Sequence, residues 1–267
     1  MTTPAPLTPM PAPQYVMSGE GHRIATYSWG EDTSPTVLAV HGFASSMRDT
    51  WVDTGWVREL LRRGFRVIGV DLRGHGASDK PHDADQYSMA AMVADLFIAL
   101  DTYLVDEAAY LGYSLGGRVG WQFMTAHAEM ITHGVLGGIP DGRPLGRLQL
   151  DEARAHVESG SPIPDDITRR YVTLAQRLPS NDIRALLALA EGLRLHEDVP
   201  PMDRPPQQPT LIATGTDDPI LADSRTLAGV LPQGSFLEIP DRDHVHAPGA
   251  RVFRTEGSAF LAARSGL

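Results

Sequence analysis

The sequence predicts an α/β fold in which a mostly parallel sheet carries helices on both faces. Short apolar runs of strand length alternate with longer stretches of helical periodicity along most of the 267 residues, and this alternation is typical of parallel sheets. The run at residues 36–40 is continuously apolar, as expected for a strand buried on both faces. A chain of this length can bury a substantial core and fits one large domain.

Eight segments have the pattern of strands, and the first two form a hairpin around Gly19-Glu20-Gly21. They are residues 15–18, 23–29, 36–40, 66–70, 108–111, 134–139, 209–214 and 235–239. Helices are expected over residues 56–63, 88–103, 115–127, 224–230 and 250–263. Ser88 is expected to cap the second of these helices.

Residues 141–206 interrupt the alternation, because they contain helical patterns over residues 148–158, 165–178 and 181–195 but no strand pattern. A purely helical insertion after the sixth strand is expected to lie as a lid over the carboxyl ends of the strands. The predicted organisation is therefore a core of residues 15–140 and 207–267, a helical lid of residues 141–206, and a disordered Pro-rich tail of residues 1–14.

The chain is acidic, with a formal net charge of −10 and no cysteine. An acidic surface is not attracted to nucleic acid or to anionic membranes, so we expect neither as a partner. The absence of cysteine excludes disulfides, a cysteine nucleophile and thiolate metal sites. No run approaches the about 18 apolar residues that span a bilayer, and the first residues lack a signal-peptide pattern. A cytoplasmic location is therefore expected.

The candidate nucleophile is Ser114, which lies between a predicted strand and a predicted helix in the sequence Gly112-Tyr113-Ser114-Leu115-Gly116. This order of strand, tight turn and helix is typical of a nucleophile elbow, in which a strained serine points its hydroxyl out of the sheet. The flanking glycines are expected because side chains there would collide with the neighbouring strand and helix.

A serine hydroxyl needs a base to take its proton and an acid to orient that base. In sheets of this kind the acid and then the histidine follow the serine in chain order. Asp217 and Asp218 follow the strand at residues 209–214, and His244 and His246 follow the strand at residues 235–239. We expect Asp218 and His244 to be the pair, the histidine because it lies nearer the end of its strand.

An oxyanion site is also required, and backbone N–H groups can provide it without reorganisation. The N–H of Leu115 at the start of the helix is one expected donor. The turn His41-Gly42-Phe43 after the strand at residues 36–40 provides a second, for which the N–H of Phe43 is expected.

These landmarks, together with residues 71–79 of sequence DLRGHGASD, resemble the α/β-hydrolase superfamily from about Tyr15 to the C-terminus. The resemblance implies an eight-stranded sheet, a Ser-His-Asp triad, no cofactor and no metal. It also implies that residues 71–79 shape a loop beside the site without being catalytic. Haloalkane dehalogenases and epoxide hydrolases of this superfamily have an aspartate at the elbow, so Ser114 argues against those reactions.

The favoured function is hydrolysis of a small-molecule ester or lactone through an acyl-enzyme. The elbow is also similar to that of SHCHC synthase, a lyase that eliminates pyruvate, in which an arginine four residues after the serine helps bind carboxylates. Arg118 matches that position, although a surface arginine in a salt bridge is an alternative. A carbon–carbon bond hydrolase and a non-catalytic ligand receptor are further alternatives, and the physiological substrate and oligomeric state are left open.

Overall fold

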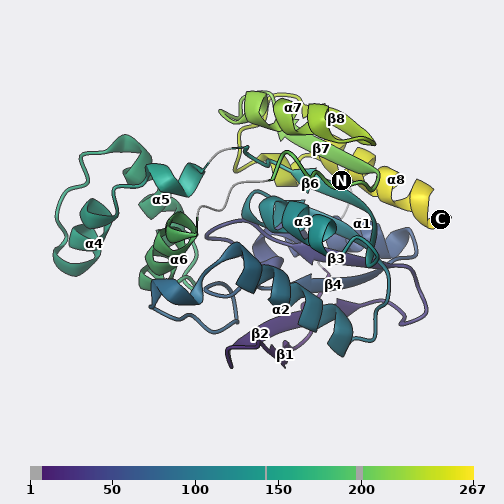
Figure 1. The fold of residues 1–267 in the computed structure, drawn as a ribbon, viewed down its shortest axis with the longest axis horizontal. Coiled ribbons are helices and arrows are strands. Elements are labelled where there is room, and N and C mark those ends of the chain that lie inside the picture. Colours follow the sequence, from purple (N-terminus) through teal and green to yellow (C-terminus); the bar gives the residue numbers. More distant parts are fainter. Residues whose placement is uncertain (1–7, 142, 197–200) are drawn as a thin grey trace, which may run out of the picture.

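The computed structural model describes residues 8–141, 143–196 and 201–267, and its eight strands form a single sheet (Figure 1). The order across the sheet is β1-β2-β4-β3-β5-β6-β7-β8. The strands are Gln14–Met17 (β1), Arg23–Trp29 (β2), Thr36–Val40 (β3), Arg66–Val70 (β4), Ala108–Tyr113 (β5), Ile131–Gly137 (β6), Thr210–Gly215 (β7) and Gly234–Ile239 (β8). The predicted eight-stranded sheet is confirmed.

The six strands from β4 to β8 in this order run parallel, whereas β1 and β2 pair antiparallel. The loops that follow β3, β5, β7 and β8 therefore lie at one edge of the sheet, where ligands bind in folds of this kind. All of the predicted site residues except Arg118 lie on these loops or at the first residue after them.

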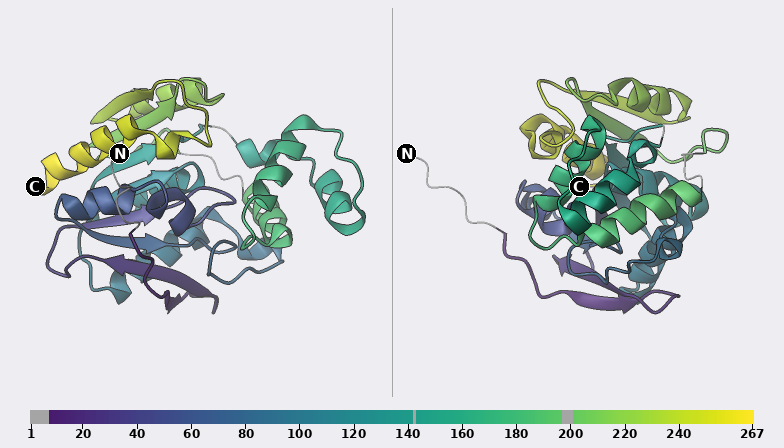
Figure 2. Two further views of the ribbon diagram at one scale, coloured as in Figure 1. Left: turned by 180° about the vertical axis from the view of Figure 1, so that it is seen from behind. Right: turned by 90° about the vertical axis from the view of Figure 1, so that its left-hand side faces the viewer.

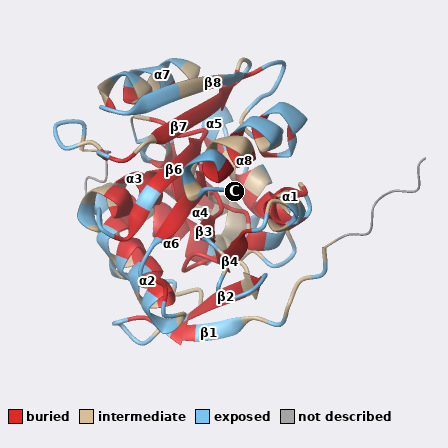
Figure 3. Ribbon diagram, turned by 90° about the vertical axis from the view of Figure 1, so that its right-hand side faces the viewer, coloured by how far each residue is buried: buried red, intermediate tan, exposed pale blue. Residues whose placement is uncertain are grey.

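Helices cover both faces of the sheet because side chains alternate along each strand (Figures 1 and 2). Leu38 and Val40 of β3 pack in one core cluster, which faces α2 (Met89–Thr102), α3 (Leu115–Ala126) and α7 (Leu221–Val230). Val37 and Ala39 pack in the other, which faces α1 (Trp56–Arg62) and α8 (Arg251–Ser265). Figure 3 shows the sheet largely buried between exposed outer helix surfaces.

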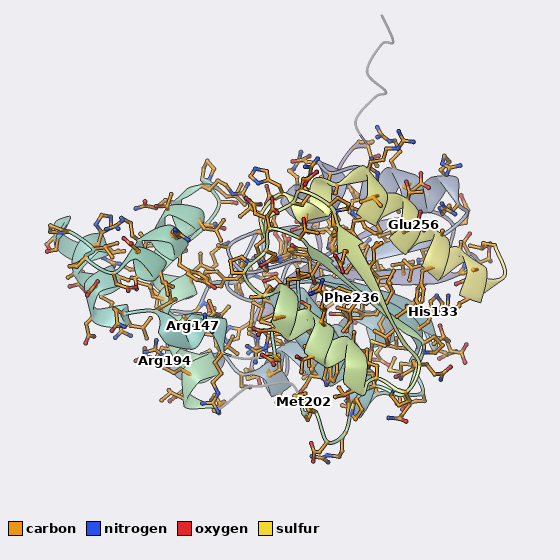
Figure 4. The ribbon with its side chains drawn as sticks, turned by 90° about the horizontal axis from the view of Figure 1, so that it is seen from above. His133, Arg147, Arg194, Met202, Phe236 and Glu256 are labelled. Atoms are coloured by element: carbon orange, nitrogen blue, oxygen red, sulfur yellow. The ribbon has the colours of Figure 1, made fainter. Side chains whose placement is uncertain are left out.

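A helical segment projects from the sheet between β6 and β7 (Figure 1). It contains a short 3-10 helix, η3 (Pro144–Arg147), and three α-helices, α4 (Leu150–Ser159), α5 (Asp166–Gln176) and α6 (Ile183–Leu195). The three α-helices agree with the predicted ones to within about two residues. Arg194 of α6 donates hydrogen bonds to the carbonyls of Gly146 and Leu148, which joins α6 to η3; Figure 4 labels Arg147 and Arg194 in this region.

Three regions differ from the sequence-based expectation. Strand β6 begins at Ile131, three residues before the predicted start at residue 134, and ends at Gly137, two residues before the predicted end. Helix α7 begins at Leu221, three residues before the predicted start at residue 224. Residues 8–13 fall in the predicted disordered tail, yet the carbonyl of Pro9 accepts a hydrogen bond from the Trp29 indole at 3.0 Å and Met10 packs on the core. The rest of that prediction, residues 1–7, lies outside the described residues. Among the described residues, no helix is both long and apolar enough to cross a membrane.

Candidate active site

The backbone at Ser114 is strained. Strand β5 ends at Tyr113 and helix α3 begins at Leu115, so Ser114 alone makes the turn between them. Its dihedral angles are φ 53° and ψ −113°, a positive φ that is costly for a residue with a side chain. This geometry is that of a nucleophile elbow and points the Ser114 hydroxyl away from the sheet.

The two flanking glycines allow the elbow to form. A Cβ atom on Gly112 would lie 2.4 Å from the carbonyl oxygen of Gly116, and a Cβ atom on Gly116 would lie 2.3 Å from the carbonyl oxygen of Val40. Such distances are far inside van der Waals contact, and the blocking atoms are backbone. The turn can therefore approach β3 and the first turn of α3 only because both positions lack a side chain.

Three predicted residues meet in one hydrogen-bonded chain. His244 Nε2 lies 2.9 Å from Ser114 Oγ, and His244 Nδ1 lies 2.7 Å from Asp218 Oδ2. The alternatives lie elsewhere: Asp217 is exposed, and His246 is 73% exposed and pairs with Asp243 at 2.7 Å. The structure thus brings Asp218, and not its neighbour, to the histidine.

The carboxylate of Asp218 fixes the protonation of the imidazole. A carboxylate only accepts, so Nδ1 of His244 carries the proton and Nε2 is left to accept the proton of Ser114. Asp218 has only 1% of its side chain exposed, and its second oxygen accepts from the N–H of Ile220 at 3.1 Å. This second bond holds the carboxylate in one orientation.

One expected oxyanion donor, Phe43, lies on a turn that packs against Ser114, and the other, Leu115, follows Ser114 directly in the chain. A Cβ atom on Gly42 would lie 3.3 Å from Cβ of Ser114, so the turn after β3 lies directly against the nucleophile. Among the described residues, the N–H groups of Phe43 and Leu115 donate to no other protein group. Two such donors beside a serine hydroxyl can bind the negative oxygen of a tetrahedral adduct.

Two buried, neutral histidines hold this turn. His41 donates from Nδ1 to the carbonyl of Gly42 at 2.7 Å and accepts at Nε2 from the N–H of Leu72 at 3.0 Å. His75 accepts at Nε2 from the N–H of Ala44 at 3.0 Å. Burial lowers the pKa of both imidazoles, and the pKa of His75 falls well below its ordinary value. Each ring therefore keeps an acceptor nitrogen for a backbone N–H at neutral pH.

Comparison with known proteins agrees with this geometry. The family model for the alpha/beta hydrolase fold matches residues 35–156. A putative 2-succinyl-6-hydroxy-2,4-cyclohexadiene-1-carboxylate synthase (SHCHC synthase) of Bacillus subtilis is 27% identical over 274 residues, which cover 91% of this chain and 96% of the relative. The chain belongs to the α/β-hydrolase superfamily.

Other members of this superfamily match it to different extents. The solved structure of a thermophilic esterase from Thermogutta terrifontis is 25% identical, with a TM-score of 0.72, and the match covers 92% of this chain and 95% of that one. Epoxide hydrolase 3 of Xenopus tropicalis is 27% identical over 124 residues, which are 46% of this chain. The chain spans only 33% of the length of that relative.

One residue of this α/β-hydrolase that the sequence did not indicate is Tyr113. Its hydroxyl donates to the backbone carbonyl of His244 at 2.7 Å, and the two rings lie 5.3 Å apart. The Tyr113 ring fills the space over Gly137 and Gly138, where any Cβ atom would lie 2.7 Å from it. Burial, with the nearby Asp218 carboxylate, raises the pKa of Tyr113 well above its ordinary value, so the hydroxyl stays a donor.

The helical segment meets the site at Phe43. Tyr171 of α5 packs on the Phe43 ring with 5.9 Å between centroids. A narrow cavity between them is lined mainly by apolar side chains: Phe43, Leu148, Ala153, Thr168, Tyr171, Val172, Ala175, Ile183, Leu186 and Leu187. The hydroxyl of Thr168 is already bonded to Asp165. The cavity has a volume of about 10 Å³, so the helical segment packs closely on Phe43 in this structure.

Arg118 lies one helical turn after Ser114 and is 6% exposed, and its backbone N–H donates to the carbonyl of Ser114 at 3.0 Å. This burial contradicts the exposed position in the alternative of a surface arginine in a salt bridge, but not the salt bridge itself.

Proposed function

We propose that this α/β-hydrolase cleaves a small-molecule carboxylic ester or lactone through an acyl-enzyme. The observation that carries the proposal is the hydrogen-bonded chain from Ser114 through His244 to Asp218, with distances of 2.9 and 2.7 Å. A serine with an oriented base and two backbone donors beside it is suited to acyl transfer.

In the first half-reaction Ser114 Oγ attacks the substrate carbonyl while His244 Nε2 takes the hydroxyl proton. The carbonyl oxygen becomes negative, and the N–H groups of Phe43 and Leu115 stabilise it. Asp218 stabilises the imidazolium that forms. His244 then gives the proton to the leaving alcohol, and the C–O bond of the substrate breaks to leave the acyl group on Ser114.

In the second half-reaction water takes the place of the alcohol. His244 removes a proton from the water, which attacks the acyl carbon through a second tetrahedral adduct in the same oxyanion site. Collapse of that adduct returns the proton to Ser114 and releases the acid. In a lactone the leaving alcohol stays attached to the acyl group, and the product is a hydroxy acid.

Epoxide opening is not proposed, in spite of the match to Epoxide hydrolase 3 over 46% of the chain. A carboxylate nucleophile opens an epoxide to an ester, which water can hydrolyse. The hydroxyl of Ser114 would instead form an ether, which water does not cleave under these conditions. The residue at the elbow therefore favours carbonyl substrates.

A second candidate is elimination of the SHCHC synthase type. It is supported by the full-length match to the Bacillus subtilis relative and by the burial of Arg118 one turn after Ser114. In that reaction the Ser114–His244 pair would remove a proton from the substrate, and no acyl-enzyme would form. Arg118 would bind a substrate carboxylate, since a guanidinium pairs with carboxylates through two parallel hydrogen bonds.

A serine-directed fluorophosphonate and a short-chain p-nitrophenyl ester test the first proposal. We expect labelling at Ser114, turnover of the ester, and a loss of kcat of at least about 1000-fold in Ser114→Ala. Intact-protein mass spectrometry of a quenched reaction should show the added acyl mass. Wild-type protein that is neither labelled nor active would overturn the proposal and favour a ligand receptor.

Arg118→Met tests the carboxylate binding that the second candidate assigns to Arg118. If Arg118 binds a carboxylate, we expect the variant to raise KM at least about tenfold for esters that carry a carboxylate. The neutral p-nitrophenyl ester is the internal control, and its KM should stay unchanged. Equal effects on both kinds of ester would count against a role of Arg118 in carboxylate binding.

A further inference from the structure

Asn181 joins the helical segment to the turn that carries one oxyanion donor. It lies between α5 and α6, and its Nδ2 donates to the carbonyl of Ala44 at 2.9 Å and to the carbonyl of Ala175 at 3.0 Å. Ala175 belongs to α5, but Ala44 follows Phe43 directly in the chain. One bond of this side chain therefore stays within the segment, and the other crosses to the core.

The neighbours of Asn181 determine which way its amide points. Both facing groups are carbonyl oxygens, which only accept, so the NH₂ group must face them. The amide oxygen on the other side is buried without a hydrogen-bond partner among the described residues. The amide NH₂ group alone therefore holds the side chain in place. The unpaired amide oxygen costs folding free energy, because it gives up its hydrogen bonds to water on burial.

The residue that Asn181 holds is strained. Ala44 is fully buried and has φ 56°, in the left-handed region that residues with a Cβ atom rarely adopt. Its N–H donates to His75 Nε2 at 3.0 Å, and its carbonyl accepts from Asn181. The hydrogen bonds to His75 and Asn181, one on each side of Ala44, therefore stabilise a backbone conformation that is unfavourable for an alanine by itself.

Relaxation of Ala44 would move Phe43. The chain after Ala44 is anchored, because the N–H of Met47 donates to the buried Asp71 at 2.7 Å. Before Phe43, Gly42 lies close to Ser114, since a Cβ atom added to Gly42 would be 3.3 Å from Ser114 Cβ, and the Gly42 carbonyl accepts from His41 Nδ1 at 2.7 Å. A change in the dihedral angles of Ala44 would therefore act on the Gly42–Phe43 peptide, which carries the Phe43 N–H and is otherwise held by the bond between its carbonyl and His41.

We propose that Asn181 is a positioning residue for the oxyanion site. By holding Ala44 in its left-handed conformation, it sets the direction of the Phe43 N–H together with His41, which holds the carbonyl of the same peptide. Docking of the helical segment then completes the site. This inference rests on the proposed acyl-transfer function. It assigns to the segment a part in transition-state stabilisation in addition to covering the site.

A second contact between the same parts of the molecule provides a matched control. Arg177, after α5, pairs with Asp49 in the π-helix η1 (Arg48–Val52) at 2.8 and 2.5 Å. Burial opposes the ionisation of Asp49, but hydrogen bonds from Arg177 and Ser45 outweigh it and lower the pKa of this carboxyl. This ion pair also docks the segment on the core. Asp49 accepts from the hydroxyl of Ser45, which follows Ala44, but neither Arg177 nor Asp49 bonds to a peptide group of Ala44.

The test compares Asn181→Ala with Arg177→Gln on a short-chain p-nitrophenyl ester and on an alkyl trifluoromethyl ketone. The ketone forms an adduct with Ser114 that carries an oxyanion, so its Ki reports the oxyanion site directly. In Asn181→Ala we expect kcat to fall and Ki to rise by about 10- to 100-fold, less than on complete loss of a donor. KM should stay within about twofold. Arg177→Gln should leave kcat and Ki within about twofold.

Unchanged kcat and Ki in Asn181→Ala would overturn the inference. Equal losses in both variants would also overturn it, because they would assign the effect to docking in general. If Asn181→Ala does not fold, Asn181→Ser, whose hydroxyl is too short to reach Ala44, carries the same expectations. Fluorophosphonate labelling of the wild type is measured first, so that failure of the proposed function is recognised separately.

Discussion

Gly116 and Gly117 are adjacent in α3 but face different surroundings. A Cβ atom on Gly116 would lie 2.3 Å from the carbonyl of Val40, whereas one on Gly117 would lie 3.4 Å from its nearest neighbours, Gly137 O and Ile139 Cβ. We expect Gly116→Ala to lower the free energy of unfolding by about 1–3 kcal/mol or more, because backbone cannot yield as a side chain can. It should also displace Ser114 and abolish ester turnover.

Gly117→Ala is the control, with stability changed by less than about 1 kcal/mol, since alanine favours helix and fits at contact distance. Urea unfolding and ester kinetics on both variants measure this difference. Equal stability of the two variants would show that the elbow is not packed as tightly as the distances imply.

Tyr113→Phe removes the hydroxyl that holds the backbone of His244. We expect kcat to fall by about 2- to 10-fold, the equivalent of one hydrogen bond, with KM unchanged, because the imidazole loses a fixed distance to Ser114. Tyr87→Phe is the matched control. Its buried hydroxyl also donates to a backbone carbonyl, that of Pro81 at 2.7 Å, so it should lower Tm similarly and leave kcat unchanged. A kcat for Tyr113→Phe equal to that of wild type would remove Tyr113 from the positioning of His244.

At the residue scale, the sequence predicts those site residues that directly follow a strand in the chain. Ser114, His244 and one of two adjacent aspartates follow from the order of strands and turns, and the structure brings them together. The roles of Tyr113, His75 and Asn181 do not follow, because each acts on a backbone group far away in the chain. A carbonyl or N–H partner leaves no signature in the sequence.

At the scale of elements, strands and long helices were predictable because period-2 and period-3.6 patterns dominate them. The start of α7 at Leu221 could not be predicted, because no capping residue marks it. Its N-cap is Ile220, which makes no side-chain hydrogen bond to the helix. The tail was expected to be disordered on composition, but Trp29 offers an indole N–H to Pro9. Tertiary contacts of this kind override local preference.

Docking of α6 depends on Gly192. A Cβ atom there would lie 2.3 Å from the carbonyl of Ala84 and 2.5 Å from that of Tyr87, beside the short helix η2 (Ala84–Gln86). We expect Gly192→Ala to push α6 from the core, which would lower the free energy of unfolding by about 1–3 kcal/mol. Hydrogen exchange in α6 should become faster.

The control for this prediction is Gly229→Ala in α7, where a Cβ atom meets nothing within 4 Å. Its stability should be unchanged or higher by up to about 1 kcal/mol, because alanine favours helix. Unaltered exchange in α6 of Gly192→Ala would contradict the close backbone packing of the helical segment.

The molecule as a whole contains three histidines that are buried among the described residues, His41, His75 and His133. Burial lowers the pKa of each one. In the unfolded chain a histidine has a pKa of about 6.5, so below that pH the unfolded state binds protons that the folded state does not. The folded state therefore loses stability as the pH falls.

We expect the free energy of unfolding to decrease from pH 7.5 to pH 5.5. Below pH 6.5, each buried histidine should contribute up to about 1.4 kcal/mol per pH unit to this decrease. His133 allows a test away from the candidate site, because it lies at the end of the molecule away from the helical segment (Figure 4) and bonds to the carbonyl of Leu261 at 3.0 Å. His133→Gln retains a donor for that carbonyl but cannot titrate. Urea unfolding at several pH values should therefore give a shallower decline for the variant, with ester turnover at pH 7.5 unchanged. An identical decline in both proteins would mean that His133 is protonated equally in the folded and unfolded states, contrary to its burial.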